Sequence, residues 1–454
     1  MKNKMIYALV LALITSGVMF AQENEVLTLT VDDAVEYAAK NSRTLKTAEL
    51  DFELAKWKKN FAWNVFLPTA QVSGTSSRSN DYTNTVGEIM KAIMPGYSPA
   101  PTTESNHWTA VGNLSVSLGL NAALVQSMRA TYSDFEAGKI TWEQTQKETE
   151  VNIRKYFYAL LLQQENVNLQ KTTLENARQR QEQAQVNFRN GYVPELSLLK
   201  AQVDYENKRP EVEKAEQALN QQMDTFAFLL GLPVGTKIAL DGQIQPVFVE
   251  VDADKIVEEY LSANLTIRNT QQSLKTLKIQ KSALDLSAYT PSLQIAWNTQ
   301  PALSNALETN WLEKDNWYDN GSLSFTIAWN LTDMLPFSSG RQQAKELQTT
   351  IAKLELQLKT LEQNTELEIR TAVDNLNQSK KAIESSQRNI DLAQRSYNMT
   401  AIAYRNGTTE LLDLRDAESS LNQAKLGLAS EQYNYISNLL DLEFKVNTRL
   451  EETK

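Results

Sequence analysis

Few side chains in this sequence are of the types that carry out covalent or metal chemistry. The chain contains no cysteine and a single histidine, His107. The lack of cysteine removes disulfides, thiolate metal sites and cysteine nucleophiles together. His107 lies in a stretch rich in Pro, Ser, Thr and Asn, which is typical of a solvated loop. Because no nucleophile, metal-ligand cluster or phosphate-binding loop stands out, we expect no enzyme, no catalytic residue, no cofactor and no metal.

Three carboxylates, Glu410, Asp413 and Asp416, lie where a helix is expected to begin. Asp413 and Asp416 are three residues apart, so on a helix they share one face. Acids in the first turns of a helix are stabilised by the helix dipole, which explains Glu410 and part of the placement of Asp413. The preceding Asn-Gly favours a turn with positive φ, and Thr408 or Thr409 could cap the helix. A helix start accounts less well for Asp416.

The net charge and the N-terminal residues indicate the cellular location and exclude one class of partner. A formal net charge of −10 argues against nucleic acid as a partner, because phosphates require a basic face. Lys2 and Lys4 precede an apolar run that ends near Ala21, which predicts a secretory signal peptide over residues 1–21 with an uncertain cleavage site. No later apolar run reaches the roughly 20 residues that a transmembrane helix needs. We therefore expect an exported protein without a helical anchor.

The elements that must position these residues occur twice. Phe188-Arg-Asn-Gly191 matches Tyr404-Arg-Asn-Gly407, and Phe66-Leu-Pro-Thr-Ala-Gln-Val matches Tyr289-Thr-Pro-Ser-Leu-Gln-Ile. These matches divide the mature chain into a first repeat, residues 22–246, and a second repeat, residues 247–454. Each repeat reads helix, strand, loop, strand, very long helix, turn, helix.

Heptad spacing predicts long paired helices. Apolar residues recur every seven positions from Ile153 and again from Ile369, and the pattern continues in the helix that follows each turn. A strict seven-residue period favours a left-handed supercoil. Helices over about 122–188 and 341–405 would each be on the order of 100 Å long, at about 1.5 Å per residue. The sequence therefore predicts coiled-coil hairpins rather than a globular core.

Alternating segments predict two strands in each repeat. They cover about 69–79 and 111–121 in the first repeat, and about 291–300 and 322–330 in the second. Strands of this length with one apolar face are typical of a membrane β-barrel, although a soluble sandwich uses the same alternation. Single-chain barrels begin at about eight strands, and unpaired edges are costly in lipid. Four strands must therefore be pooled between copies, giving eight in a dimer or twelve in a trimer.

The duplicated order, the Leu-Pro switch from helix to strand and the segment Tyr404-Arg-Asn-Gly-Thr-Thr-Glu-Leu-Leu-Asp-Leu-Arg-Asp-Ala417 resemble the TolC-like outer-membrane efflux factors. The resemblance implies a fold that is mainly α with a membrane β-barrel portion. In it, four strands per chain form a twelve-stranded trimeric barrel over an α-helical coiled-coil tunnel. It also implies an outer-membrane channel of a tripartite efflux or type I secretion system. Such a homotrimer would contact outer-membrane lipid, extend helices into the periplasm, and bind a periplasmic adaptor (membrane fusion) protein and an inner-membrane pump.

The resemblance also assigns roles to residues. By position, Tyr404, Asp413 and Asp416 correspond to the tyrosine and the aspartates of the family's entrance constriction. The family also has a basic residue and a first-repeat aspartate beside them, and these are Thr409 and Ser197 here. The sequence therefore does not decide how tightly the entrance is closed. We expect the turns that join the heptad helices to face the adaptor; their residues are Asn190, Gly191, Tyr192, Asn406, Gly407 and Thr408.

A second class of function fits the helices alone. An exported structural or adhesive surface protein could be a coiled-coil stalk whose strands form a small soluble sheet. Such a stalk needs no β-hairpin inserted at the same place in both repeats, so the duplication favours the duct. The sequence does not indicate the cargo, the pump or the adaptor.

Overall fold

The computed structural model describes residues 26–233 and 235–450, so the expected signal peptide lies outside the described residues. The chain forms two compact units. The first comprises Met1–Asp51, Ile140–Arg268 and Thr360–Lys454, and the second comprises Phe52–Lys139 and Asn269–Lys359. Each unit therefore takes segments from both sequence repeats, so the compact units do not coincide with the repeats.

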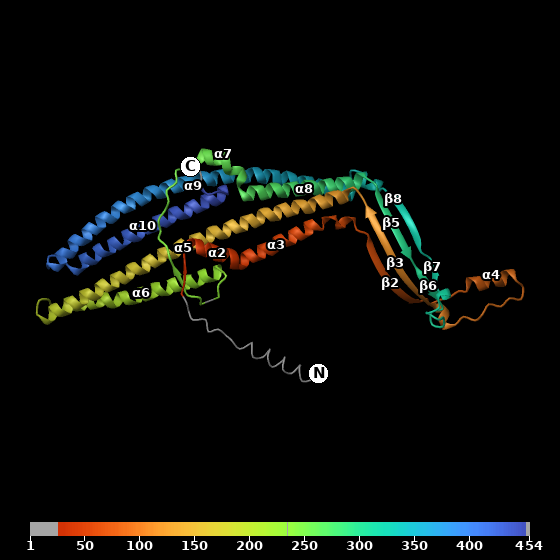
Figure 1. Ribbon diagram of the computed structural model, residues 1–454, viewed down its shortest axis with the longest axis horizontal. Coiled ribbons are helices and arrows are strands. Elements are labelled where there is room, and N and C mark those ends of the chain that lie inside the picture. Colours follow the sequence, from red (N-terminus) through yellow and green to blue (C-terminus); the bar gives the residue numbers. More distant parts are fainter. Residues whose placement is uncertain (1–25, 234, 451–454) are drawn as a thin grey trace, which may run out of the picture. The chain divides into compact units, whose positions relative to one another are not determined.

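Very long helices run through the boundaries between the units. The longest are α5 (Ala123–Arg189) and α9 (Ser339–Arg405), each of 67 residues, and α3 (Arg43–Asn60) and α8 (Leu265–Tyr289) also cross a boundary (Figure 1). The first unit also contains β1 (Leu27–Leu29), α2 (Val31–Asn41), α6 (Glu195–Leu229), β4 (Ile238–Leu240), α7 (Ala253–Tyr260), a 3-10 helix over Leu261–Ala263, and α10 (Leu411–Val446).

The second unit is built around an antiparallel sheet. Its main strands are β2 (Thr69–Arg78), β3 (Trp108–Leu120), β5 (Ser292–Thr299) and β8 (Ser322–Ala328). Short strands β6 (Pro301–Ser304) and β7 (Tyr318–Asp319), helix α4 (Thr85–Ile93), and 3-10 helices over Ala62–Phe66, Glu104–His107, Lys314–Asn316 and Leu331–Met334 complete it. Pro68 and Pro291 directly precede β2 and β5, because proline ends helical geometry and begins extended chain.

The sheet is open at both edges. β3 pairs with β2 on one side and with β5 and β6 on the other, while β5 pairs with β8 and β6 pairs with β7. In register, Val72 lies opposite Leu114, Val116 opposite Trp297, and Ile295 opposite Phe325. β2 and the β7/β8 edge each lack a second neighbour among the described residues. Every residue of β8 is exposed, although Leu323, Phe325 and Ile327 alternate as apolar residues along it.

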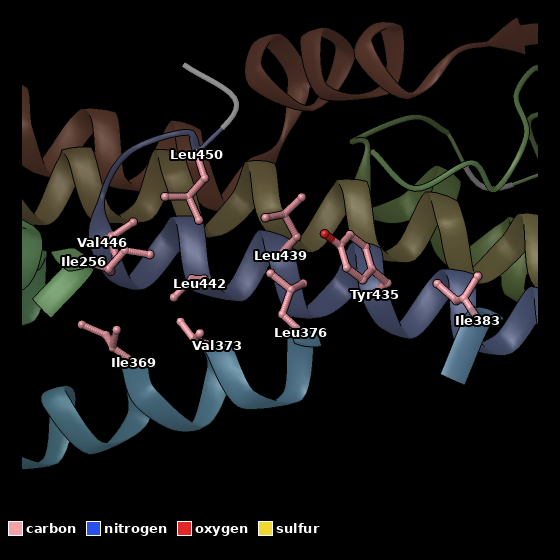
Figure 2. Packing of buried hydrophobic residues seen from close by; sticks show 10 residues of the cluster. All are labelled: Ile256, Ile369, Val373, Leu376, Ile383, Tyr435, Leu439, Leu442, Val446 and Leu450. Atoms are coloured by element: carbon pink, nitrogen blue, oxygen red, sulfur yellow. The ribbon is translucent and has the colours of Figure 1, made fainter. Parts of the chain in front are cut away.

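The heptad positions of the second repeat form a buried seam in the first unit. Figure 2 shows Ile369, Val373 and Leu376 of α9 facing Leu439 and Leu442 of α10. Ile256 of α7, Ile383, Tyr435, Val446 and Leu450 complete this cluster. Burial of each large apolar side chain stabilises the packing by about 1.5–3 kcal/mol. Tyr435 remains satisfied because its hydroxyl accepts a 2.9 Å hydrogen bond from the Val249 backbone N–H.

The first repeat forms the matching cluster. Ile153, Phe157 and Leu160 of α5 pack against Phe226 and Leu230, at the end of α6. The parallel pair β1 and β4 borders this cluster and aligns Leu27 with Ile238. Farther along the hairpins the heptad positions change character: Leu174, Gln181, Ile390 and Tyr397 are only partly buried, and Phe188 is exposed. The continuous apolar core therefore ends before the hairpin turns.

His107, expected in a solvated loop, is partly buried and ends the 3-10 helix Glu104–His107. The His107 Nδ1 atom lies 2.8 Å from the Ser79 carbonyl oxygen, in the loop region between β2 and β3. Over residues 26–233 and 235–450, no helix is both long and apolar enough to span a membrane.

Candidate functional site at the hairpin turns

The two turns that join the long helices have the same backbone structure. Gly191 and Gly407 have φ values of +74° and +73°. The Tyr192 N–H donates to the Asn187 carbonyl at 2.8 Å, and the Gly191 N–H donates to Phe188 at 2.9 Å. In the second turn the Thr408 and Gly407 N–H groups donate to Ala403 and Tyr404, each at 3.0 Å. This is the Schellman ending of a helix, in which glycine adopts positive φ without a Cβ clash.

All six residues predicted to form the adaptor-facing turns are exposed. They are Asn190, Gly191, Tyr192, Asn406, Gly407 and Thr408. Tyr192 has 79% of its surface accessible, although it is a large aromatic residue. A Cβ added at Gly191 or Gly407 would meet no atom within 4 Å, so the glycines serve the backbone conformation and not close packing.

Asp413 belongs to the cap of α10. Glu410 is the N-cap residue, and the Asp413 carboxylate accepts hydrogen bonds from the Glu410 backbone N–H at 3.3 Å and from the Thr409 hydroxyl. The expectation that Thr408 or Thr409 caps the helix is therefore wrong. The Thr408 hydroxyl donates back to the Ala403 carbonyl at 3.0 Å, and the Thr409 hydroxyl is held by Asp413.

Asp416 lies one turn farther along α10 and is not part of the cap. Its side chain is exposed and makes no hydrogen bond or ion pair with any described residue, while its backbone carbonyl accepts a 2.8 Å bond from the Ser420 hydroxyl. Asp416 lines a polar groove of about 410 Å³, together with Lys208, Glu211, Arg415, Glu418, Ser419 and other residues of α5, α6 and α10. Asp416 therefore offers a free carboxylate, whereas the carboxylate of Asp413 is already engaged.

Tyr404, the third predicted constriction residue, is half-buried at the end of α9. Burial raises the pKa of its phenol; Arg180 opposes this rise and the negative charge of Asp204 adds to it. The phenol is therefore a neutral hydrogen-bonding group beside two charged residues of the first hairpin. Tyr397, two turns earlier on α9, likewise has its pKa raised by burial and by Glu418.

An ionic cluster near Tyr397 and Tyr404 joins the two hairpins. Its members are Arg180, Asp204, Arg415 and Glu418. The Arg180 Nη2 atom lies 2.9 Å from Glu418 Oε2 and 3.5 Å from Asp204 Oδ2. Arg415 contributes its Nε atom, 3.1 Å from Asp204 Oδ1. Asn176 donates a 2.7 Å hydrogen bond to Glu418. The cluster thus links α5 and α6 of one hairpin to α10 of the other.

Three members of the cluster are buried. The accessible fractions of the Arg180, Asp204 and Glu418 side chains are 11%, 3% and 5%, whereas that of Arg415 is 47%. Removing charges from water costs several kcal/mol per ion, and attraction repays this only in a closed network. Among the described residues the Arg180 Nε atom has no hydrogen-bond partner, so the network is not fully satisfied there. Such a cluster fixes the register of the two hairpins. Substitution of one member leaves a buried charge unpaired, which destabilises the folded protein.

The sequence contains a signal for this cluster, which the heptad analysis did not use. Glu418 occupies the buried stripe of α10 between Leu414 and Leu421, and Asp204 follows Leu198 and Ala201 on the buried face of α6. A charged residue at an apolar position of a helix requires a partner of opposite charge. The positions equivalent to Arg180 and Asp204 at the repeat offset of 216 residues are Ser396 and Ser420, so the cluster is not duplicated.

Ser197, the first-repeat position that departs from the entrance pattern, lies in the first turn of α6. Its backbone N–H donates to Pro194 at 2.9 Å, and Pro194 is the N-cap residue of the helix. Across the described parts of the chain, no group of three or more His, Asp or Glu residues is arranged to hold a metal ion.

Comparison with known proteins identifies related chains. The family described as "Outer membrane efflux protein" matches residues 34–232 and 275–447. Outer membrane protein TolC of Escherichia coli (strain K12) is 28% identical over 125 residues, which are 27% of this chain and 25% of TolC. The matched part thus spans about a quarter of the length of that relative.

Solved structures share the fold over nearly the whole chain. The Campylobacter jejuni CmeC outer membrane channel matches with a TM-score of 0.74 and 15% identity, covering 93% of this chain and 87% of CmeC. The open state of the Neisseria gonorrhoeae MtrE outer membrane channel matches with a TM-score of 0.70 and 15% identity, covering 92% and 89%. The expected fold class, mainly α with a sheet that a single chain leaves open, is confirmed.

Proposed function

Because the chain belongs to the outer membrane efflux protein family, we propose that it is the outer-membrane duct of a tripartite efflux or type I secretion system. The resemblance to TolC-like efflux factors and the outer-membrane localisation expected from the sequence are confirmed by this membership. In the proposed system, an inner-membrane pump supplies the energy, a periplasmic adaptor holds the pump to the duct, and the duct conducts substrates passively.

The open sheet carries this proposal. β2 and the β7/β8 edge each have backbone groups without a strand partner, and the apolar residues of β8 are exposed. Both features are unfavourable in an isolated chain. An unpaired edge strand tends to pair with a strand of another chain, and an exposed apolar surface tends to be buried against a partner or in lipid. Pairing β2 of one copy with β8 of the next removes every edge. Three copies then give twelve strands, which suffice for a barrel with a wet lumen in lipid.

We predict that the protein extracted in mild detergent is a homotrimer. The measurement is the mass of the protein component by light scattering or native mass spectrometry. A stable monomer or dimer would contradict the twelve-stranded barrel. Extraction conditions provide a second check, because release from membranes by high salt alone would favour the structural or adhesive coiled-coil protein.

In this proposal the hairpin turns meet the adaptor. They are the exposed ends of both hairpins, and the continuous apolar core ends before them. Tyr404, Asp413 and Asp416 follow or precede the second turn, so the entrance constriction would lie directly beside the docking surface. Three copies would place six aspartates around one opening, and carboxylates around a narrow opening concentrate cations.

Gly407→Val is predicted to reduce crosslinking of the adaptor to the trimer severalfold. A β-branched residue at φ +73° is strained, because the left-handed conformation costs roughly 1–2 kcal/mol for an ordinary residue. The turn should therefore change shape. Gly427→Val is the matched control, since Gly427 lies within α10 with open space around it and has no positive φ.

In that experiment both variants must remain trimeric. Equal crosslinking of the two variants to the adaptor would contradict the assignment of the turns, and so would loss of the trimer by Gly407→Val alone. Gly191→Val should behave like Gly407→Val, because its φ is +74° and its hydrogen bonds are the same.

A further inference from the structure

Helix α4 presents an apolar face that none of the described residues of its own chain covers. It lies in the segment between β2 and β3 and stands away from the sheet (Figure 1). Val86, Ile89, Met90 and Ile93 recur at the spacing of one helical face, and among them Ile93 is 70% exposed. Gly87 is the one buried residue of the helix, which Asn84 caps through a 2.9 Å bond to the Gly87 N–H.

A second apolar surface lies in the segment between β6 and β7, residues 305–317. Leu307 and Trp311 are exposed there, and Leu312 is 96% exposed. The segment is not loose. The Trp311 indole donates to the Ala306 carbonyl at 2.7 Å, and the Trp317 indole donates to the Trp311 carbonyl at 2.9 Å. The two rings pack edge to face with centroids 5.8 Å apart. The exposed leucines are therefore presented on a preformed surface.

This surface is also fastened to the sheet. Leu303, Ala306 and Ala110 form a buried cluster beneath it. Asn106 donates a 2.7 Å bond to the Asn305 side chain, and the Ser105 hydroxyl accepts a 3.1 Å bond from the Glu308 backbone N–H. A rigid apolar surface loses little conformational entropy when a partner covers it.

The topology attaches these two surfaces to one end of the sheet. β2 ends at Arg78, which pairs with Trp108 at the start of β3, and α4 follows. β6 pairs with Thr109–Val111 at that same end, and β7 lies beyond β6. When β2 of one copy pairs with the β7/β8 edge of the next, the strand that leads into α4 lies beside the strands that flank the 305–317 segment of that copy.

We propose that the apolar face of α4 docks onto residues 305–317 of the adjacent copy and so fastens neighbouring copies at the outer end of the barrel. The inference rests on the proposed trimer. A second copy fits better than lipid, because Glu88 and Lys91 are the only charged residues of α4. A helix that lies on a membrane surface usually carries a Lys- and Arg-rich polar face. The 305–317 segment is itself acidic, with Glu308, Glu313, Lys314 and Asp315.

Disulfide crosslinking tests the docking directly, because the chain has no cysteine of its own. A chain carrying Ile89→Cys is co-expressed with a differently tagged chain carrying Leu312→Cys, and the trimers are oxidised mildly. We expect a reducible covalent dimer that contains both tags. The matched control replaces Ile89→Cys by Glu88→Cys, which points away from the apolar face, and should give less than about a tenth of that product.

The outcomes separate this inference from the proposed function. A trimer by mass that gives no more mixed dimer with Ile89→Cys than with Glu88→Cys would overturn the docking and leave the duct intact. A monomer by mass would overturn both. A photoreactive benzophenone residue at Ile93 should label a second copy of the chain; labelling of lipopolysaccharide instead would also contradict the docking.

A pair of substitutions provides an independent readout. Ile89→Asp with Ile93→Asp places charges on the docked face, and should lower the temperature at which the detergent-solubilised trimer dissociates. Both residues are exposed within one chain, so the chain itself should fold normally. Lys91→Asp is the control for added negative charge on α4. An equal effect of the control and the apolar-face variant would contradict the proposal.

Discussion

Replacing Arg180 with methionine is expected to destabilise the helical hairpins by about 3–5 kcal/mol, because it leaves the buried Glu418 carboxylate without a counter-charge and buried Asp204 with only the half-exposed Arg415. Asp204 and Glu418 both pair with Arg180, and both are almost inaccessible to water. Arg415 is half-exposed and reaches only Asp204, so it cannot replace Arg180 beside Glu418. The measurement is urea unfolding of the trimer in detergent, followed by the helical circular dichroism signal.

Arg178→Met is the matched control on the same helix. Arg178 is about half-exposed and pairs with Glu175 on the helix surface, and such exposed pairs contribute about 0–1 kcal/mol. Equal destabilisation by the two variants would show that the ionic cluster does not hold the hairpins together. The triple variant Arg180→Met, Asp204→Leu and Glu418→Leu should recover much of the loss, since no buried charge remains without a partner.

Asp416→Asn is expected to raise the concentration of a divalent or trivalent cation that blocks the channel by at least tenfold. A doubly charged cation about 8 Å from a carboxylate gains on the order of 1 kcal/mol even in bulk water, and three copies contribute together. Each 1.4 kcal/mol corresponds to a tenfold change in affinity. The current through a planar bilayer is recorded while the ion is added on the side of the hairpin turns.

Asp413→Asn should have the smaller effect of the two substitutions. The Asp413 carboxylate already accepts hydrogen bonds from Thr409 and from the Glu410 N–H, whereas Asp416 has no such partner among the described residues. Asp391→Asn, which removes an exposed carboxylate from α9, is the control for net charge. If the double variant at Asp413 and Asp416 is blocked at the parent's ion concentration, neither aspartate lines the constriction, and Asp413 serves only the start of α10.

The features set by local chemistry were predicted closely from the sequence. Helices expected over about 122–188 and 341–405 span Ala123–Arg189 and Ser339–Arg405. The heptad repeat and the Asn-Gly turns mark the ends of these helices through residues that are close in sequence, so tertiary contacts were not needed to predict them. Proline marked where extended chain begins, because it fixes φ and lacks a backbone donor. The four main strands lie within two or three residues of their expected positions.

The ionic cluster could not be predicted in the same way, because its geometry joins distant residues. Arg180 and Glu418 are 238 positions apart, and only the packing of one hairpin against the other brings them within 2.9 Å. The strands β6 and β7 and helix α4 were also expected as loop, since their segments are rich in turn-forming residues. The cap by Glu410 was missed because glutamate is not among the residues usually found at an N-cap, which are Ser, Thr, Asp, Asn and Gly.

The cluster also bears on how the proposed entrance would close. Thr409 and Ser197 replace the residues that the family pattern places in the closing network, and Thr409 is hydrogen-bonded to Asp413 within its own helix start. Arg180, Asp204 and Glu418 provide another set of polar contacts between the hairpins, next to Tyr404. Loss of Arg180 should therefore loosen the entrance as well as destabilise the hairpins.

The most direct test of the central claim is the single-channel current of the purified trimer in a planar lipid bilayer. We expect discrete, cation-selective current steps, with a larger mean conductance for Arg180→Met than for Arg178→Met. Parent and variants must be compared at the same protein concentration and shown to be trimeric by mass. Trimeric protein that inserts into the bilayer and produces no current steps, in the parent or in Arg180→Met, would contradict the conclusion that this chain forms an outer-membrane duct.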